Sequence, residues 1–410
     1  MDVFLISERS SRCPLSTLGR AAVLPLIDTL GLDPAKAGAF LESIEERYNP
    51  EVAYHNSTHA ADVLNNLLYF LRLLAEPLHS FEPMEKLTGL LVAGAHDVGH
   101  PGRANRYHTA AQSPLALLFN DQSVLENMHC AIMFAVLRVE ASNLLEGLDL
   151  GVQAAFRNLA IQMILNTDLA KHVKAVSAFR QEFLDLDRNF TRQVSTSTTD
   201  GKSNQSKRKD LLSFLLKCSD VGGSAKHFSL HVNWTMRIFC EFYDQGDAES
   251  ALGLPCSPFC NRTEVCLHDC QHGFFAFVVA PMFNALSDYL HSQRLQFEVI
   301  NQMERNHEFW RTLDDDVERK VDHGNPLANV PLLTLVHRQQ QLSINTNLDM
   351  EDSCSFTGHG ASPTLEPRFS NSSFGSEPWG SKTAQPPKPS TSLRKELQRI
   401  VEGKSSTSVD

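Results

Sequence analysis

The amino-acid sequence predicts an all-α protein, and three observations lead to that fold class. Apolar residues recur at helical spacing from about residue 15 to about residue 330, so one amphipathic segment follows another. Segments with the alternating, β-branched character of strands are nearly absent. Hydrophobic residues make up 42% of the 410 residues, which is enough to bury a core. We therefore predict a compact multi-helix bundle.

The predicted helices follow one another along the chain. Helical periodicity is clearest in segments 60–74, 114–118, 123–139, 156–165, 210–216 and 230–243. The longest apolar run, residues 87–95, stops at His96 and Asp97. It suits a buried helix but is too short to cross a bilayer, so we expect no membrane span.

Two polar segments divide the chain. Residues 191–209 (TRQVSTSTTDGKSNQSKRK) contain almost no apolar residue and predict a loop. Ser, Pro, Gly and Asn dominate after about residue 348, which predicts a disordered tail over 348–410. Within it, residues 393–402 have the pattern of a short amphipathic helix, interpreted as transient rather than as a docking motif. The expected organisation is an N-terminal extension over 1–14 and one domain over 15–330.

Charge and cysteine usage limit the classes of partner. The net charge of −11 argues against non-specific binding of nucleic acid. The N-terminus lacks a basic region followed by a sustained apolar stretch, so no secretory signal is expected. Nine scattered cysteines, an odd number, fit free thiols in a reducing cytosol. These features predict a cytoplasmic protein without a nucleic-acid partner.

Two short polar runs carry the strongest functional signal. The first spans residues 54–63 and reads YHNSTHAADV. If this run is helical, His55 and His59 are four residues apart and share a face. Asp62, three residues further on, would then lie near that face.

The second run spans residues 96–102 and reads HDVGHPG. It follows the buried apolar segment, and Pro101 disfavours helical geometry at His100, so we expect the helix to end there. A later run, KCSDV, places Asp220 at the end of another apolar helix. Polar groups at the ends of buried helices predict a pocket where the helices meet.

Two imidazoles and two carboxylates suit a zinc-like ion that keeps open positions for water. A carboxylate with a free lone pair can bridge to a second, harder ion such as Mg²⁺ or Mn²⁺. Two such ions can hold a bridging hydroxide and neutralise a phosphate. The alternative is a set of satisfied core histidines and acids at helix ends. We favour the metal site because burying so many ionisable groups without an ion is costly.

At this point the chain resembles a known family. The order His59, His96-Asp97, Asp220 is that of the HD-type metallophosphohydrolases. Six runs together are similar to the class I 3′,5′-cyclic-nucleotide phosphodiesterase catalytic domain: YHNSTHAADV, HDVGHPGRAN, NDQSVLENMH, KCSDV, WTMRIFCEFYDQGD and QHGFFAFVVAPMF. The resemblance covers about residues 15–319. It implies a bundle of the HD/phosphodiesterase type and metal-dependent hydrolysis of cAMP or cGMP to the 5′-monophosphate by a metal-bridging hydroxide.

The resemblance also implies roles for individual residues. His59, His96, Asp97 and Asp220 would hold a tightly bound Zn²⁺, and Asp97 would also reach a second ion, Mg²⁺ or Mn²⁺. The positions that contact or support the water shell of the second ion are His100, Asn105, Glu126, His129 and Thr167. His55 matches the general acid that protonates the leaving O3′. We expect Glu126 to accept a hydrogen bond from His55 or from metal-bound water.

A further set of residues matches the pocket for the purine base. Gln271 would pair with the edge of the base, because a carboxamide offers a donor and an acceptor together. Phe274 would stack on the base and Ile238 would form the opposite wall. Other positions that would line the substrate pocket are Tyr54, Phe242 and Phe259. Core packing is the alternative for each aromatic residue, but Gln271 in an apolar helix needs a polar partner.

The match departs from the family at a few positions. Gly99 stands where many members have an acidic residue, and His231 replaces a tyrosine of the cAMP-specific branch. Gly223 replaces an asparagine of cAMP-selective members, which leaves cAMP only slightly favoured over cGMP. The spacing of Cys256, Cys260, Cys266 and Cys270 is unusual for a zinc knuckle and favours unpaired thiols.

Two other functions and two kinds of partner stay open. The chain could be another HD-type nucleotide phosphohydrolase, which would need the metal ligands but not Gln271. It could also be a cyclic-nucleotide-binding scaffold with weak turnover, which the intact ligand set disfavours. The resemblance further leaves open a homodimer and regulators that bind the tail.

Overall fold

The computed structural model describes residues 1–74, 81–184 and 200–351, and within these ranges it contains helices and no strand. This confirms the predicted all-α class. The first half contains α1 (Val3–Arg9), α2 (Pro14–Leu30), α3 (Pro34–Glu45), α4 (Ser57–Leu73), α5 (Pro83–Ala95), α6 (Asn105–Ala110), α7 (Pro114–Leu118), α8 (Val124–Leu137), η2 (Glu140–Ser142), α9 (Leu150–Leu165), η3 (Leu169–Lys171) and α10 (His172–Phe183). The second half contains α12 (Asp200–Asp220), η4 (Val221–Ala225), α13 (Phe228–Ala251), α14 (Leu267–Phe274), η5 (Phe275–Val279), α15 (Ala280–Leu290), α16 (Gln293–Leu295), η6 (Gln296–Ile300), α17 (Asn301–Arg311), α18 (Asp315–Glu318), η7 (Pro326–Asn329) and α19 (Val330–Glu351).

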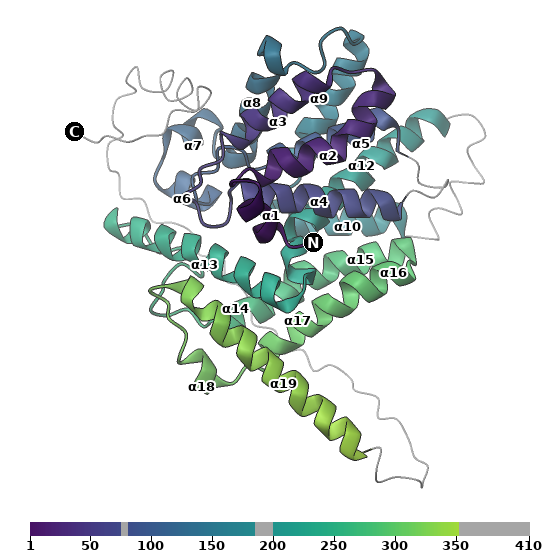
Figure 1. Cartoon of the computed structure of the whole chain (residues 1–410). Helices are drawn as coiled ribbons and strands as arrows, with labels where there is room; N and C mark the ends of the chain where they lie inside the picture. The colour runs from purple at the N-terminus through teal and green to yellow at the C-terminus, as the bar shows by residue number, and fades with distance from the viewer. Residues whose placement is uncertain (75–80, 185–199, 352–410) are drawn as a thin grey trace.

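Helix α5 is the central element of the bundle. It packs against α2, α4, α9 and α12, and the apolar segment 87–95 is buried throughout. Close approach is possible because Gly94 lacks a side chain: a Cβ there would lie 3.1 Å from the Leu15 side chain. In Figure 1 the helices α2, α4, α5 and α12 form one part of the body, and α13, α14, α17 and α19 lie below it. The site residues come from the ends of α4, α5 and α12, so this packing determines their positions.

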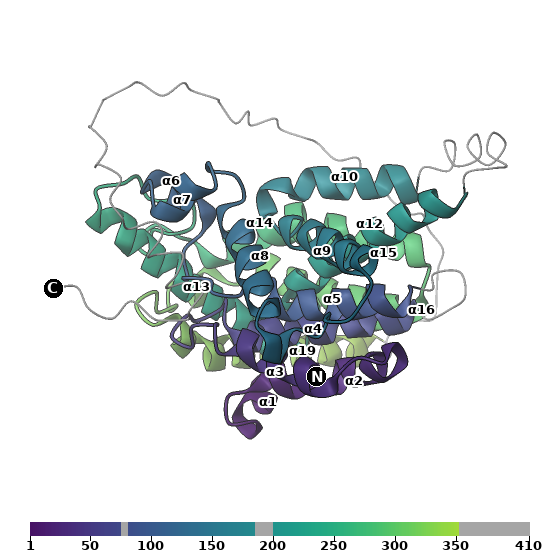
Figure 2. The ribbon, with the colours of Figure 1, turned by 90° about the horizontal axis from the view of Figure 1, so that it is seen from above.

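The second view shows how the later helices complete the body. In Figure 2 α10, α12 and α15 lie side by side, and α6 and α7 sit near one end of α13. Helix α1 packs on α4, and the rings of Phe4 and Trp234 lie 4.6 Å apart. The expected N-terminal extension therefore contacts the bundle, although its boundary at residue 15 stays a prediction.

The predicted loop over 191–209 is wrong in its second half, because residues 200–209 begin α12. Residues 191–199 lie outside the described residues. The polar start of this helix is held by charge pairs on neighbouring helices. Arg208 pairs with Glu85 at 2.9 Å and Lys207 with Glu182 at 3.4 Å. Loop-like composition thus gives way to helix where tertiary ion pairs and an apolar continuation are available.

The end of the domain also differs from the prediction. Helix α19 continues to Glu351, so residues 348–351, assigned to the tail, are helical. Residues 352–410, including the amphipathic segment 393–402, lie outside the described residues.

Within the described ranges, one helix is long and apolar enough to cross a membrane by length and composition. It spans Leu267–Leu290 and comprises α14, η5 and α15, with 33% of its most apolar window buried. Core helices pass the same test, so the feature is weak evidence for a span. The expected absence of a membrane span therefore stays a prediction.

Candidate metal centre and substrate site

The start of α4 presents the first histidine. Asn56 is the N-cap, and its side-chain oxygen accepts hydrogen bonds from the backbone N–H groups of Thr58 and His59 at 2.9 and 3.3 Å. His59 therefore lies in the first turn, where it is 2% exposed. His55 precedes the helix, so the prediction that both histidines lie on one helical face is wrong. Because Asn56 is the N-cap, α4 begins at Ser57, and His55 lies before the helix.

The end of α5 presents the next two residues. The helix ends at Ala95 with His96 as its C-cap, earlier than the predicted end at His100. Gly99 has a φ of +78°, outside the right-handed helical region. The chain has therefore left the helix before Pro101. Tyr48 holds this turn, since its hydroxyl accepts from the Asp97 N–H at 3.3 Å and donates to the Gly94 carbonyl at 3.0 Å.

The tautomer of His96 is set by its backbone partner. Its Nδ1 atom donates to the carbonyl of Ala93 at 2.9 Å, so the lone pair lies on Nε2. That Nε2 atom is buried, and its only contacts with polar groups among the described residues are the carboxylates of Asp97 and Asp220. A buried acceptor nitrogen that faces carboxylates is the arrangement expected of a metal ligand.

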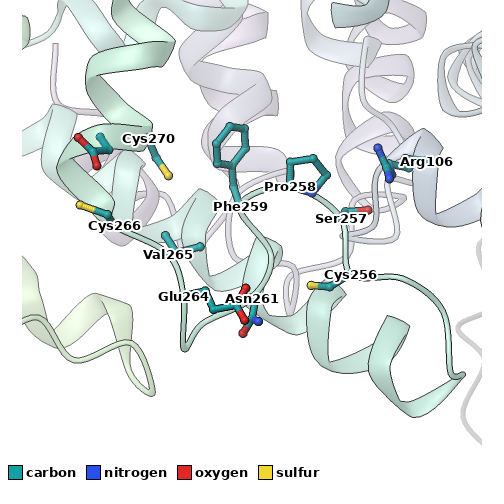
Figure 3. A pocket seen from close by; sticks show the side chains of 11 residues that line it. Arg106, Cys256, Ser257, Pro258, Phe259, Asn261, Glu264, Val265, Cys266 and Cys270 are labelled. Atoms are coloured by element: carbon teal, nitrogen blue, oxygen red, sulfur yellow. The ribbon is translucent and has the colours of Figure 1, made fainter. Parts of the chain in front are cut away.

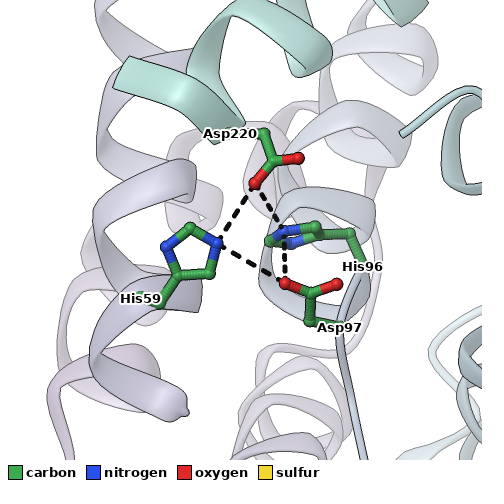
Figure 4. A group of neighbouring side chains, drawn as sticks. All are labelled: His59, His96, Asp97 and Asp220. Atoms are coloured by element: carbon green, nitrogen blue, oxygen red, sulfur yellow. Dashed lines mark hydrogen bonds and ion pairs between the residues drawn. The ribbon is translucent and has the colours of Figure 1, made fainter. Parts of the chain in front are cut away.

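The fourth residue, Asp220, is the last residue of α12. Asn66 of α4 supports this helix end by donating to the Ser219 carbonyl at 3.0 Å. Figure 4 shows His59, His96, Asp97 and Asp220 directed toward a common point from three helix ends. The predicted convergence of these residues, which are distant in sequence, is therefore observed.

The donor atoms of this cluster fit one ion. His59 Nε2 lies 3.1 Å from Asp220 Oδ1 and 3.5 Å from Asp97 Oδ2. His96 Nε2 lies 3.1 Å from Asp97 Oδ2 and 3.3 Å from Asp220 Oδ1. Ligand atoms bound about 2.0–2.2 Å from one zinc-like ion would lie roughly 3–3.5 Å apart. The separations and the two N plus two O donor set therefore suit a divalent cation.

Burial makes the charges in this cluster dependent on each other. Burial alone would raise the pKa of Asp97, but His96 and His59 hold it well below its usual range. Burial would likewise lower the pKa of His96, but Asp97 and Asp220 hold it well above its usual range. In this setting the carboxylates stay ionised and the protonated imidazole supplies positive charge, which a bound cation would supply in place of that proton.

Asp62, expected near the site, does not join the cluster. Its Oδ1 atom pairs with Lys226 Nζ at 2.8 Å, and Lys226 also donates to Asn66. The ion pair turns Asp62 into a structural link between α4 and the segment before α13.

His55 has a partner that the sequence analysis missed. The Nδ1 atom of His55 lies 2.6 Å from Oε2 of Glu241 on α13. The other carboxylate oxygen accepts the backbone N–H groups of Tyr54 and His55 at 2.7 and 2.8 Å. Glu241 is 6% exposed. A glutamate three residues after Ile238 on the same inward helical face was the signal that could have found it.

Of the two partners expected for Glu126, His55 is wrong, because His55 pairs with Glu241; metal-bound water stays a prediction. Glu126 instead accepts from the Asn105 side chain at 2.9 and 3.2 Å. Burial disfavours the charged form of His55, but Glu241 outweighs this effect and raises the pKa of His55 to about 9. The His55 ring also stacks on His100, with ring centroids 3.9 Å apart.

Most of the residues expected around a second ion lie beside Asp97 or each other. His129 Nε2 lies 3.7 Å from Asp97 Oδ1, and its Nδ1 atom donates to the Val98 carbonyl at 2.8 Å. Burial raises the pKa of Glu126 to about 7. Thr167 differs, because its hydroxyl donates to the Ile164 carbonyl at 2.8 Å and no described contact joins it to the other members.

Most of the expected base-binding residues lie on α13 and α14, and Tyr54 precedes α4. Gln271 is 7% exposed, and its carboxamide makes no hydrogen bond to a described residue. Phe274, Ile238 and Phe242 are half-buried against the core, and the Tyr54 ring lies 4.5 Å from that of His59.

Figure 3 shows a pocket at the loop between α13 and α14. Phe259 lines it together with Arg106, Pro258, Val265 and Cys266. Gln271 and Phe274 do not line it. The prediction that Phe259 shares a pocket with Gln271 is therefore not supported by this cavity.

The comparisons with known proteins agree with this arrangement. Residues 54–302 match the family model described as 3′5′-cyclic nucleotide phosphodiesterase. The chain is 31% identical over 316 residues to 3′,5′-cyclic-AMP phosphodiesterase 4C of Mus musculus, covering 76% of this chain and 44% of that protein. It is 36% identical over 299 residues to dual specificity calcium/calmodulin-dependent 3′,5′-cyclic nucleotide phosphodiesterase 1 of Drosophila melanogaster. This match covers 70% of this chain and 33% of that protein.

A solved structure is similar as well. The phosphodiesterase domain of the RhoPDE fusion protein from the choanoflagellate Salpingoeca rosetta superposes with a TM-score of 0.66 at 28% identity, over 74% of this chain and 92% of that chain. The chain spans less than half the length of the mouse and fly relatives. By the family match over residues 54–302, the chain belongs to the 3′,5′-cyclic nucleotide phosphodiesterase family.

Proposed function

We propose that the chain hydrolyses 3′,5′-cyclic nucleotides to 5′-nucleoside monophosphates, with cAMP slightly favoured over cGMP. The observation that carries the proposal is the convergence of His59, His96, Asp97 and Asp220 beside the paired His55 and Glu241. Family membership and the names of the relatives support the same substrate class.

The four converging residues would hold a tightly bound Zn²⁺, and Asp97 would share a second ion, Mg²⁺ or Mn²⁺. When bound, the ions would supply Lewis-acid activation of water and neutralise charge on the phosphate. His100, Asn105, Glu126, His129 and Thr167 are proposed to support the water around the second ion. His129 and Glu126 are the best placed of these, because His129 lies beside Asp97 and Glu126 is anchored by Asn105.

His55 is proposed as the general acid. Hydrolysis forms a bond from phosphorus to a water oxygen and breaks the bond from phosphorus to O3′. The O3′ alkoxide is a poor leaving group, so a nearby proton donor lowers the cost of its departure. Because Nδ1 of His55 is held by Glu241, Nε2 is the atom free to deliver that proton. Glu241 therefore orients the ring and keeps it protonated.

Substrate selection is proposed to come from Tyr54, Ile238, Phe242, Gln271 and Phe274. Gln271 would donate to and accept from the purine edge, because its carboxamide carries both a donor and an acceptor. Phe274 and Ile238 would hold the base between apolar faces.

The eight described cysteines are free, which supports a cytoplasmic location. A homodimer and tail-bound regulators stay predictions.

The test is turnover of cAMP and cGMP, measured side by side on purified full-length chain with Mg²⁺. We expect hydrolysis of at least one substrate to its 5′-monophosphate. If neither is hydrolysed while bound metal is confirmed by elemental analysis, the proposal is overturned. Retained nucleotide affinity without turnover would instead favour the binding scaffold.

A further inference from the structure

A further group of side chains that could hold a metal ion lies outside the four-residue cluster. Cys266, His268 and Glu318 each offer a donor atom, and these atoms all lie within 4.8 Å of one another. Cys266 is the N-cap of α14, His268 lies in its first turn, and Glu318 ends α18. The three residues join two segments separated by about fifty positions in the chain.

The separations between donors suit one ion. Cys266 Sγ lies 3.3 Å from Nδ1 and 3.7 Å from Nε2 of His268. His268 Nδ1 lies 3.6 Å from Oε2 of Glu318. A zinc ion with about 2.3 Å to sulfur and about 2.0–2.2 Å to nitrogen and oxygen would place its ligands at such separations.

The two oxygens of Glu318 have different surroundings. Oε1 accepts the backbone N–H of Leu267 at 2.6 Å, which caps α14 and orients the carboxylate. Oε2 is buried and has no hydrogen-bond partner among the described residues. The Glu318 side chain is only 13% exposed, so this oxygen needs a partner that the protein does not provide.

The local charge also favours a cation. Asp269 adds a second carboxylate, 3.4 Å from Nε2 of His268. A divalent cation would stabilise the thiolate and satisfy the free carboxylate oxygen at once.

We propose that Cys266, His268 and Glu318 bind a Zn²⁺-class ion, with water at the fourth position. Cysteine spacing alone favoured unpaired thiols. The structure replaces that cysteine pattern with a mixed set in which two of the ligands are not cysteines, and Cys256 is not a member. Cys266 also lines the pocket of Figure 3, which gives an ion a route from solvent.

The ion would tie the start of α14 to α18. Helix α14 carries Gln271 and Phe274, so the site would stabilise the segment that presents them. This role does not depend on the proposed hydrolysis, and its test does not rely on activity.

The test replaces zinc by Co²⁺ in the full-length protein and records the absorption spectrum. A thiolate ligand produces an intense near-ultraviolet charge-transfer band. The cluster of His59, His96, Asp97 and Asp220 contains no sulfur and cannot produce it. We expect the band in the unmodified protein and its loss in Cys266→Ala and His268→Ala. Cys256→Ala, a matched change in the same loop, should keep it.

Metal counting by mass spectrometry provides the second measurement. Cys266→Ala should contain one zinc fewer per chain than Cys256→Ala after identical gel filtration. Glu318→Gln keeps an acceptor for the Leu267 N–H and should still lower zinc affinity at least tenfold, which guards against a fold defect in the other variants. An unmodified protein without the band, or a band that survives Cys266→Ala, would overturn the proposal.

Discussion

Nδ1 of His55 lies 2.6 Å from Oε2 of Glu241, and the same carboxylate accepts the backbone N–H groups of Tyr54 and His55. One buried side chain from α13 thus fixes the ring, its tautomer and the chain that carries it. This relationship places the proposed proton donor beside the four-residue cluster, although His55 itself is outside any helix.

Glu241→Gln should lower kcat about 10- to 100-fold and shift its pH dependence. Burial disfavours the His55 cation, and Glu241 is the main group that raises its pKa to about 9. The donor form exists below that pKa. Without the carboxylate the pKa falls, so the alkaline limb of the kcat profile should move to lower pH. A rate–pH series on both proteins checks this.

The matched control for that change is Asp244→Asn, one turn along the same helix. Asp244 is exposed, and its ion pair with Arg262 is long, at 3.9 Å. The loss of this weak contact should leave the pH profile unchanged. An unaltered alkaline limb in Glu241→Gln would contradict the role given to Glu241.

Asp220→Ala should abolish activity and lower the metal content of the purified protein. Asp220 Oδ1 lies between both histidine Nε2 atoms, so its removal takes away a donor that no neighbour replaces. Elemental analysis alongside an activity assay provides the measurement. Unchanged metal content would refute the ligand assignment.

Asp62→Asn should separate stability from metal binding. Because buried Asp62 pairs with the partly buried Lys226, its loss should cost about 3 kcal/mol of unfolding free energy. The folded variant should nevertheless keep its bound metal, since Asp62 is not part of the cluster. Urea unfolding and metal analysis of the same sample decide the point; a metal-free folded variant would show that Asp62 is a ligand.

Gln271→Ala should reduce kcat/KM for the preferred cyclic nucleotide about 10- to 100-fold, the cost of leaving the base edge without its hydrogen bonds. The exposed Gln293→Ala is the control and should retain full kcat/KM. Full activity in Gln271→Ala would point to another HD-type nucleotide phosphohydrolase, whose substrate needs no such contact.

Lys217→Met should destabilise the fold by about 2–3 kcal/mol. Lys217 is 2% exposed, and its ammonium donates to the carbonyls of Asn166, Thr167 and Asp168 at 2.9, 3.3 and 3.1 Å. Removing it leaves the carbonyls of Asn166 and Thr167, just after α9, without their donor, while the Asp168 carbonyl keeps the Lys171 N–H. Thermal or urea unfolding measures the change, and the exposed Lys320→Met should fall within about 0.5 kcal/mol of the unmodified protein. Equal stability of the two variants would contradict the capping role.

Much of the fold and part of the site could be predicted because they depend on local patterns. The apolar run at 87–95 predicts α5, since nine consecutive apolar or small residues suit only a buried element. The motifs of His59, His96, Asp97 and Asp220 predicted a common site because polar residues at the ends of buried helices need partners. Residues 200–209 were misassigned because their composition is that of a loop, and the ion pairs that hold them as helix come from α5 and α10.

The sequence by itself determined the helical class, because helical periodicity is a local property, and it indicated the four converging residues through the resemblance of their motifs to a known family. Only the tertiary structure decided which carboxylate holds His55, that Asp62 pairs with Lys226, and that Cys266 meets His268 and Glu318. The physical reason is that side-chain partners are chosen by the packing of distant helices. Glu241 of α13 reaches His55 across 186 positions of the chain, whereas Glu126 of α8 accepts from Asn105.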